Sequence, residues 1–238
     1  MASDLIARFD GMVDELRRDP EIDVLHYLVR PPDPSEIEEV ERALGYPLGA
    51  AITEFYEACG GIQLLWIRKT HEEYEERARL VREEVERSGG SFDEGWFYGG
   101  NNGDAMHPDG VILIPSIKRA FLDESFNNNN SGSGVVGMLE AYKAALADRE
   151  AVIYRGFEMF YPTVNVAFAL NGQPDPVLAA AYDRYEYDDS ALIHFREYLE
   201  LLLVSRGDAK RAFGFLLDSD RVGKVITHED VGHWAPNE

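Results

Sequence analysis

The sequence predicts an α+β fold with an antiparallel sheet. Apolar side chains recur at helical spacing in several segments before residue 90, three short β-rich runs follow within residues 151–187, and helical spacing returns after residue 191. Helices, then strands, then helices is an order typical of α+β domains. With 238 residues, 45% of them hydrophobic, the chain can build a sizeable core. We therefore expect one domain spanning residues 1–238.

Residues 3–18 are expected to form a helix, because their apolar side chains fall on one stripe of a charged segment. Residues 21–29 alternate loosely and predict an extended stretch. Pro31, Pro32 and Pro34 then exclude a helix and predict an extended connection. Residues 1–30 are interpreted as an N-terminal helical extension of the domain.

The next two helices have clear start and stop signals in the sequence. Ser35 and Glu38 have the spacing of a capping box, which predicts a helix that ends at Gly45. A second helix is expected after Pro47, carrying Cys59 on its apolar face and ending at residues 60–61. Residues 62–67 predict a buried strand.

Residues 71–88 predict a highly charged helix with a thin apolar stripe. Such a helix is expected to form a solvated outer layer, with partner contact as the alternative. Residues 88–110 are rich in glycine and asparagine and predict a long loop. Together, residues 68–109 are interpreted as an inserted helix and loop.

The remaining chain predicts strands followed by helices. Residues 111–114 predict a short strand, residues 127–134 a low-complexity loop, and residues 137–148 a possible helix. Three β-rich runs follow, the second and third joined by hairpin turn chemistry at residues 171–174. The runs are 152–159, 163–170 and 177–182.

The C-terminal part predicts two helices and a tail. Residues 191–205 place their leucines and Phe195 on one helical face, and residues 209–217 predict a last helix. The rest is polar, so residues 206–238 are interpreted as a C-terminal helix and polar tail.

The charge excludes two classes of partner. Forty-four acidic residues against 23 basic ones leave a formal charge of −21. Such a surface repels nucleic-acid phosphates and anionic membranes, so we expect neither as a partner. Two explanations remain open: general solubility, or long-range attraction of a basic protein.

The chain shows no sign of export or membrane insertion. Its one cysteine, Cys59, cannot form an internal disulfide, and no apolar run approaches the roughly 18 residues of a membrane span. The first 19 residues lack the pattern of a signal peptide. We expect a cytoplasmic location.

The order of elements and several strings of this sequence resemble the SUKH superfamily, the Smi/Knr-type family. That superfamily includes bacterial immunity proteins against polymorphic toxins and a fungal cell-wall regulator. The resemblance covers residues 34–67 and 110–205. The residues that carry it are 34–41 with Leu44 and Gly45, Phe55 and Tyr56, Gly60 and Gly61, Trp66, 110–117, Asp175 to Val177, 185–189, Phe195, Tyr198 and Leu199.

Membership would imply a SUKH-like fold: a mixed, largely antiparallel sheet with helices packed around it, and no cofactor. It would also imply that function lies in a variable binding surface. A shared fold does not by itself establish a function, so this step is an analogy.

No catalytic or metal-binding motif is evident. The closest approach to a metal pair is His228 and His233, whose spacing of five puts the two rings on different faces of a helix. The glycine-rich residues 99–103 lack the lysine and following helix of a phosphate loop. A nucleophilic role for Cys59 is disfavoured by its apolar helical context. We expect no catalytic residues, no metal and no cofactor.

Two segments are candidates for partner binding. In the first, tyrosines that offer rigid contact area alternate with carboxylates that would meet a basic partner. The alternative is a strand edge with its tyrosines inward and its acids solvated. The second is an aromatic loop that either forms an interface or folds back onto the core. The candidate residues are Asp183, Tyr185, Glu186, Tyr187, Asp188, Asp189, Trp96 and Phe97.

The sequence thus favours a non-catalytic, acidic protein-binding module. The leading hypothesis is an immunity protein that neutralises a bacterial toxin, such as a nuclease, by occupying its cationic groove. A scaffold or regulator in a signalling or cell-envelope complex is the alternative. A third possibility is an undetected hydrolase, which would show perturbed pKa values clustered in a cleft.

Overall fold

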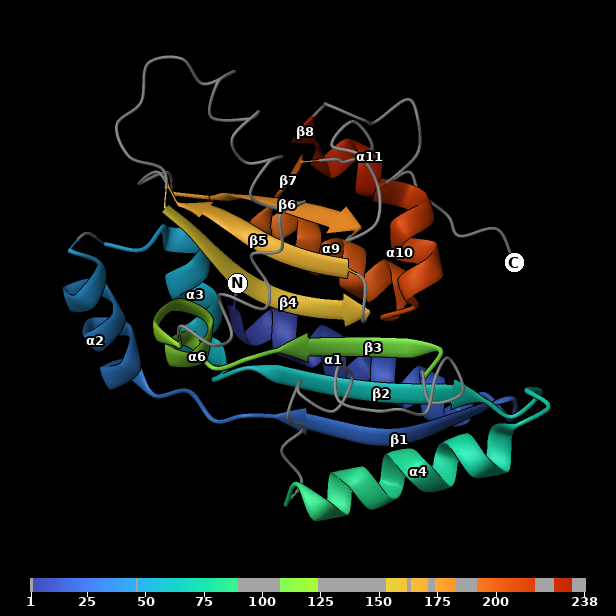
Figure 1. Cartoon of the computed structure of the whole chain (residues 1–238). Coiled ribbons are helices and arrows are strands. Elements are labelled where there is room, and N and C mark those ends of the chain that lie inside the picture. The colour runs from blue at the N-terminus through green and yellow to red at the C-terminus, as the bar shows by residue number, and fades with distance from the viewer. Residues whose placement is uncertain are drawn as a thin grey trace.

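Helices and antiparallel strands build an α+β fold in the computed structural model, which describes residues 2–45, 47–89, 108–123, 153–161, 164–170, 174–182, 192–216 and 225–232 (Figure 1). The helices are α1 (Ala2–Arg18), α2 (Pro34–Leu44), α3 (Ala50–Ala58), α4 (Tyr74–Arg87), α6 (Ile117–Leu122), α9 (Phe195–Ser205), α10 (Ala209–Leu216) and α11 (His228–Gly232). The strands are β1 (Ile22–Val29), β2 (Ile62–Arg68), β3 (Gly110–Ile114), β4 (Ile153–Tyr161), β5 (Val164–Leu170), β6 (Val177–Tyr182), β7 (Leu192–His194) and β8 (Val225–Ile226).

The strands form two sheets. The first has the order β1-β2-β3 and is antiparallel throughout. The second has the order β4-β5-β6-β7-β8 and is antiparallel except for the parallel pair β7 and β8. The edge strands β3 and β4 lie side by side (Figure 1). The expected mixed, largely antiparallel pairing is therefore present, but it is divided between two sheets.

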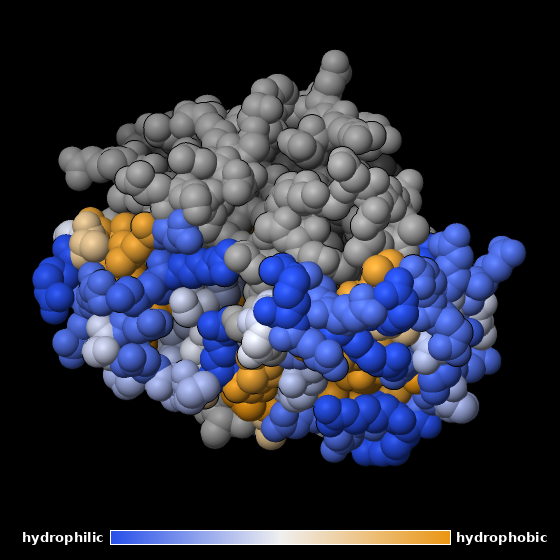
Figure 2. All heavy atoms as spheres, turned by 60° about the horizontal axis from the view of Figure 1, so that its bottom comes forward, coloured by the Kyte–Doolittle hydropathy of each residue, from blue (hydrophilic) through white to orange (hydrophobic). Residues whose placement is uncertain are grey.

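The first sheet is covered on both faces. Leu64 and Ile112, which are register partners, belong to the main core together with α1, whereas Leu65 on the opposite face packs with Val81 of α4. Burial on both faces explains why β2 reads as a nearly continuous apolar run. The outer surface at α4 is largely hydrophilic over the described residues (Figure 2). The helix expected at residues 71–88 is thus confirmed, as α4.

The helix expected at residues 3–18 is confirmed as α1, and it is part of the core. Phe9, Val13 and Leu16 are fully buried, at positions that one helical face presents to the sheet. Residues 1–30, which the sequence suggested as an extension, therefore contribute α1 to the core and β1 to the first sheet.

The predicted capping box at the start of α2 was wrong. The N-cap is Asp33, whose carboxylate accepts from the backbone N–H of Ser35 at 3.0 Å and from the Ser35 hydroxyl at 2.6 Å. Pro34 takes the first helical position, where a missing N–H costs nothing. The predicted end is confirmed, because Gly45 adopts φ 79°, a left-handed conformation that glycine tolerates.

Three other boundaries differ from expectation. The helix expected from residue 191 begins at Phe195, because Leu192–His194 pairs with β6 as β7. Cys59 lies just beyond the end of α3 in extended conformation. The expected polar tail includes β8 and α11, which bury Ile226 and Val231 in the main core. These short elements contain too few apolar residues to produce a periodic signal.

Several expected elements lie outside the described residues. These are most of the loop at residues 88–110, the low-complexity loop at 127–134 and the possible helix at 137–148. The turn expected at residues 171–174 is described only at Pro174, although β5 and β6 pair as the predicted antiparallel hairpin strands.

Trp66 joins the first sheet to the turn that follows α9. Its indole N–H donates to the carbonyl of Arg206 at 2.7 Å, and the backbone N–H of Val111 donates to the carbonyl of Gly207 at 2.8 Å. Gly110 lies against the ring so closely that an added Cβ would sit 1.8 Å from the indole nitrogen. The absence of a side chain at residue 110 is therefore a condition of this junction.

We predict that Gly110→Ala lowers the free energy of unfolding by about 1–3 kcal/mol, because the new methyl group overlaps the Trp66 ring. The matched control is Gly11→Ala in the exposed interior of α1, where nothing lies within 4 Å of the added Cβ. The control is expected to stabilise by up to about 1 kcal/mol through helix propensity. Urea denaturation measures both, and equal effects would contradict the steric explanation.

Candidate functional site

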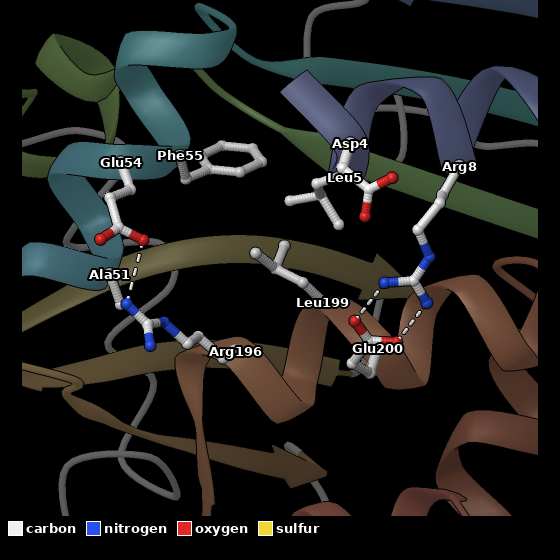
Figure 3. Close-up of a pocket in the computed structure, with 9 residues that line it drawn as sticks. All are labelled: Asp4, Leu5, Arg8, Ala51, Glu54, Phe55, Arg196, Leu199 and Glu200. Atoms are coloured by element: carbon white, nitrogen blue, oxygen red, sulfur yellow. Dashed lines mark hydrogen bonds and ion pairs between the residues drawn. The ribbon is translucent and has the colours of Figure 1, made fainter. Parts of the chain in front are cut away.

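Three helices meet at a pocket of about 210 Å³, which we call the helix pocket (Figure 3). Its lining comes from the first turns of α1, α3 and α9, and each helix contributes residues at i, i+3 or i+4 spacing, which share one face. The lining residues are Asp4, Leu5, Arg8, Ala51, Glu54, Phe55, Arg196, Leu199 and Glu200.

The floor of the helix pocket is apolar and firmly packed. Ala51, Phe55 and Leu199 are all buried, and Leu5 is partly buried against the main core. The Phe55 ring meets the Phe195 ring edge-on with centroids 5.6 Å apart. Because these side chains belong to the core, the floor is expected to keep its shape in the free protein.

Two ion pairs cross the rim of the pocket (Figure 3). Arg8 of α1 donates through its two terminal guanidinium nitrogens, Nη1 and Nη2, to the Glu200 carboxylate of α9, with Nη1 2.5 Å from Oε1. This hydrogen bond is the main cause that raises the pKa of Arg8. Arg196 of α9 donates to Glu54 of α3 at 3.0 Å. Each pair ties α9 to a neighbouring helix, so both guanidinium groups are engaged.

The backbone amides at two of the converging helix starts are also engaged. The N–H of Ala51 donates to the carbonyl of Pro174 at 2.9 Å, and that of Phe195 to the carbonyl of Pro176 at 3.0 Å. The N–H of Arg196 lies 3.4 Å from Oδ1 of Asp175. The start of a helix favours an anion when its amides are open, so this preference is already used at α3 and α9.

Asp4 is the remaining charged group of the lining. Within the part of the chain that the structure describes, its carboxylate makes no hydrogen bond or ion pair, although its field contributes to the raised pKa of Arg8. The lining thus holds three carboxylates against two guanidinium groups. An apolar floor below a rim with excess negative charge is suited to non-covalent binding.

Among the lining residues that the structure describes, none is a serine, threonine, cysteine, lysine or histidine, the residue types that supply the usual nucleophiles and an imidazole base. An exposed histidine contacts a carboxylate elsewhere: His71 Nε2 lies 3.0 Å from Asp109 Oδ1, and Asp109 also accepts from the Arg68 backbone N–H.

Across the described segments, histidine, cysteine and carboxylate side chains nowhere gather in threes as a metal site would need. Among the described helices, none is long and apolar enough to cross a membrane.

Cys59 lies in the main core. Burial raises the pKa of its thiol to about 11, and a backbone hydrogen bond at Gly61 offsets only part of this effect. Since the thiolate is the reactive form, the folded protein holds this sulfur in an unreactive state at neutral pH.

The two segments predicted from the sequence as binding sites are not described by the structure. All of the candidate residues fall in undescribed ranges, so they remain predictions. They are Asp183, Tyr185, Glu186, Tyr187, Asp188, Asp189, Trp96 and Phe97. No sequence pattern predicted the helix pocket. Its only local signal is a charged residue beside each apolar stripe, such as Arg8 beside Leu5 and Phe9, and that pattern is common to most surface helices.

No protein-family model, no curated protein and no solved structure matches this chain. The resemblance to the SUKH superfamily therefore remains a prediction from the sequence.

We predict that Glu200→Gln lowers the free energy of unfolding by up to about 1 kcal/mol, because it removes the charge that Arg8 pairs with on a partly exposed rim. The loss is expected to shrink at high salt. Asp14→Asn is the control, since its pair with Arg17 is longer, at 3.5 Å, and more exposed, and no measurable loss is expected. Chemical denaturation at low and high salt measures both variants. A salt-independent loss for Glu200→Gln would contradict the electrostatic origin.

We predict that Cys59 resists thiol reagents in the folded protein at pH 8. With a pKa of about 11, only about one thiol in a thousand is ionised at that pH. Labelling with a chromogenic disulfide is expected to be at least about a hundredfold slower than in urea. The chain has one cysteine, so the signal is unambiguous. Rapid stoichiometric labelling of the folded protein would show that the thiol is accessible and ionised.

Proposed function

We propose that this protein is a non-catalytic module that binds a basic protein partner, in the manner of a bacterial immunity protein that neutralises a toxin by direct contact. The observation that carries the proposal is the helix pocket: a small apolar floor bordered by paired charges and an excess carboxylate. The best-packed anchor positions of protein interfaces have this character, with a desolvated centre and a polar surround.

The size of the pocket favours a side chain over a whole small molecule. Pockets that bury drug-sized ligands or cofactors usually measure about 300–1,000 Å³. The helix pocket, at about 210 Å³, falls below that range. It can accept one anchoring side chain, while the surrounding helices supply the rest of a contact area.

The charge supports a basic partner. The neighbouring helices α2 and α3 carry Glu36, Glu38, Glu39, Glu41, Glu54 and Glu57 against the single base Arg42. Burial is the main cause that raises the pKa of Glu36, and the nearby negative charge of Asp33 adds to it. With a formal charge of −21 on the chain, long-range attraction would speed the encounter with a cationic protein.

The sequence resemblance supports the biological setting. We extend the proposal to a SUKH-like fold and a cytoplasmic location, where an immunity protein would meet a toxin that has entered the cell. This extension is an analogy with the superfamily.

The test is a rescue and binding experiment with the protein encoded by the neighbouring gene. Co-expression of the full chain is expected to restore growth of cells poisoned by that protein, and the purified pair is expected to bind more weakly as salt rises. Failure to restore growth, together with no binding at low salt, would overturn the proposal.

Two charge reversals assign the binding face. Glu57 lies on α3, three residues beyond Glu54 and therefore on the same side of the helix. Reversing its charge with Glu57→Lys is expected to weaken binding about tenfold. Glu86→Lys makes the same change of charge on α4, on the opposite face of the first sheet from α1, and is expected to change affinity by no more than about twofold. Equal losses would show that only net charge matters and that this face is not the interface.

A further inference from the structure

We infer that the helix pocket receives one long cationic side chain of the partner, an arginine or a lysine, with its methylene stem on the floor and its charged head at Asp4. This inference rests on the proposed function and assigns the chemistry of its central contact. The evidence is the combination of an apolar floor, engaged guanidinium groups and one unengaged carboxylate in the same pocket.

The floor suits an aliphatic stem. Leu5, Ala51, Phe55 and Leu199 present only carbon to the pocket, since none of their side chains carries a polar atom. Arginine and lysine bury their stems along such surfaces while they keep the charged head near water or a carboxylate. Asp4 of α1, whose side chain is exposed, lies near Arg8 at the pocket and provides that position for the head (Figure 3).

The electrostatics select a cation over an anion. An anion would need Arg8 or Arg196, and each already pairs with a glutamate across the rim. It would otherwise need open helix amides, and at α3 and α9 the first amides donate to residues 174–176. A cation needs only a carboxylate without a partner, and Asp4, which has none among the described residues, supplies one without breaking either ion pair.

The charge also argues against a second copy of this chain as the occupant. Two molecules that each carry a formal charge of −21 repel one another at long range. A partner with exposed arginine or lysine is attracted by the same field. The occupant is therefore a different, basic protein.

The experiment is a methyl-detected NMR titration of the full chain with small probes. n-Butylguanidinium and n-pentylammonium represent the two cationic side chains, and pentanoate is an anion of similar length. Either cation is expected to shift the methyl resonances of Leu5, Ala51 and Leu199 with low-millimolar affinity, and pentanoate is not. Pentanoate binding as tight as the cations, or no shift of these methyl groups by either cation up to about 50 mM, would overturn the inference.

A matched pair of variants assigns the charge. Asp4→Asn is expected to weaken cation binding about two- to fivefold, because it removes one partly exposed carboxylate at the head position. Glu86→Gln removes one exposed charge from α4 and is expected to leave the affinity unchanged. An unchanged affinity for Asp4→Asn would exclude Asp4 as the contact and overturn the inference.

The probe titration needs no partner, so its failure can be separated from failure of the proposed function. If the probes bind as expected but the protein encoded by the neighbouring gene neither binds nor is neutralised, only the proposed function is contradicted. A partner that binds normally to Asp4→Asn, while the probes fail to reach the pocket, would contradict this inference alone.

Discussion

A chain of aromatic contacts joins α3 and α9, two of the three helices that form the helix pocket, to the second sheet and α6. Phe55 of α3 meets Phe195 at the start of α9, Phe195 meets Phe168 of β5 at 5.3 Å, and Phe168 stacks on Phe121 of α6 at 5.6 Å. Such rings are large, rigid and well ordered in the core, so each contact fixes the position of the next. Phe55 is at once the first member of this chain and part of the pocket floor. The shape of the pocket is therefore a consequence of core packing.

Charge pairing refines the arrangement that the aromatic rings establish. Arg8 and Glu200 link α1 to α9, and Arg196 and Glu54 link α9 to α3, so the two ion pairs join α9 to both of the other helices above an apolar floor. Partly exposed pairs of this kind contribute little to stability. In the binding that we propose, their larger effect would be on recognition, because they occupy both arginines and leave the excess negative charge at Asp4. Under that proposal, the rim that stabilises the helices modestly would also decide the sign of charge that the pocket accepts.

Local patterns predicted most of the elements correctly but failed at boundaries where tertiary contacts compete. The apolar stripe of α1 and the continuous apolar run of β2 were sufficient to identify both elements. Leu192–His194 also continued the helical pattern of α9, yet pairing with β6 made it a strand. At α2 the capping position went to Asp33, one residue before the proline, and not to Ser35. Propensity and periodicity are short-range properties, and they cannot register a partner strand that lies elsewhere in the chain.

The sequence by itself determined the α+β class, the order of most elements, the acidic charge and the absence of a recognisable catalytic motif, because composition and periodicity carry these properties directly. It could not locate the helix pocket. Arg8 and Glu200 are 192 residues apart, and Arg196 and Glu54 are 142 residues apart. Each residue alone resembles any charged position on an amphipathic helix. Only the packing of α1, α3 and α9 against one another brings these side chains together, since proximity between distant segments is a property of the folded core and not of local sequence.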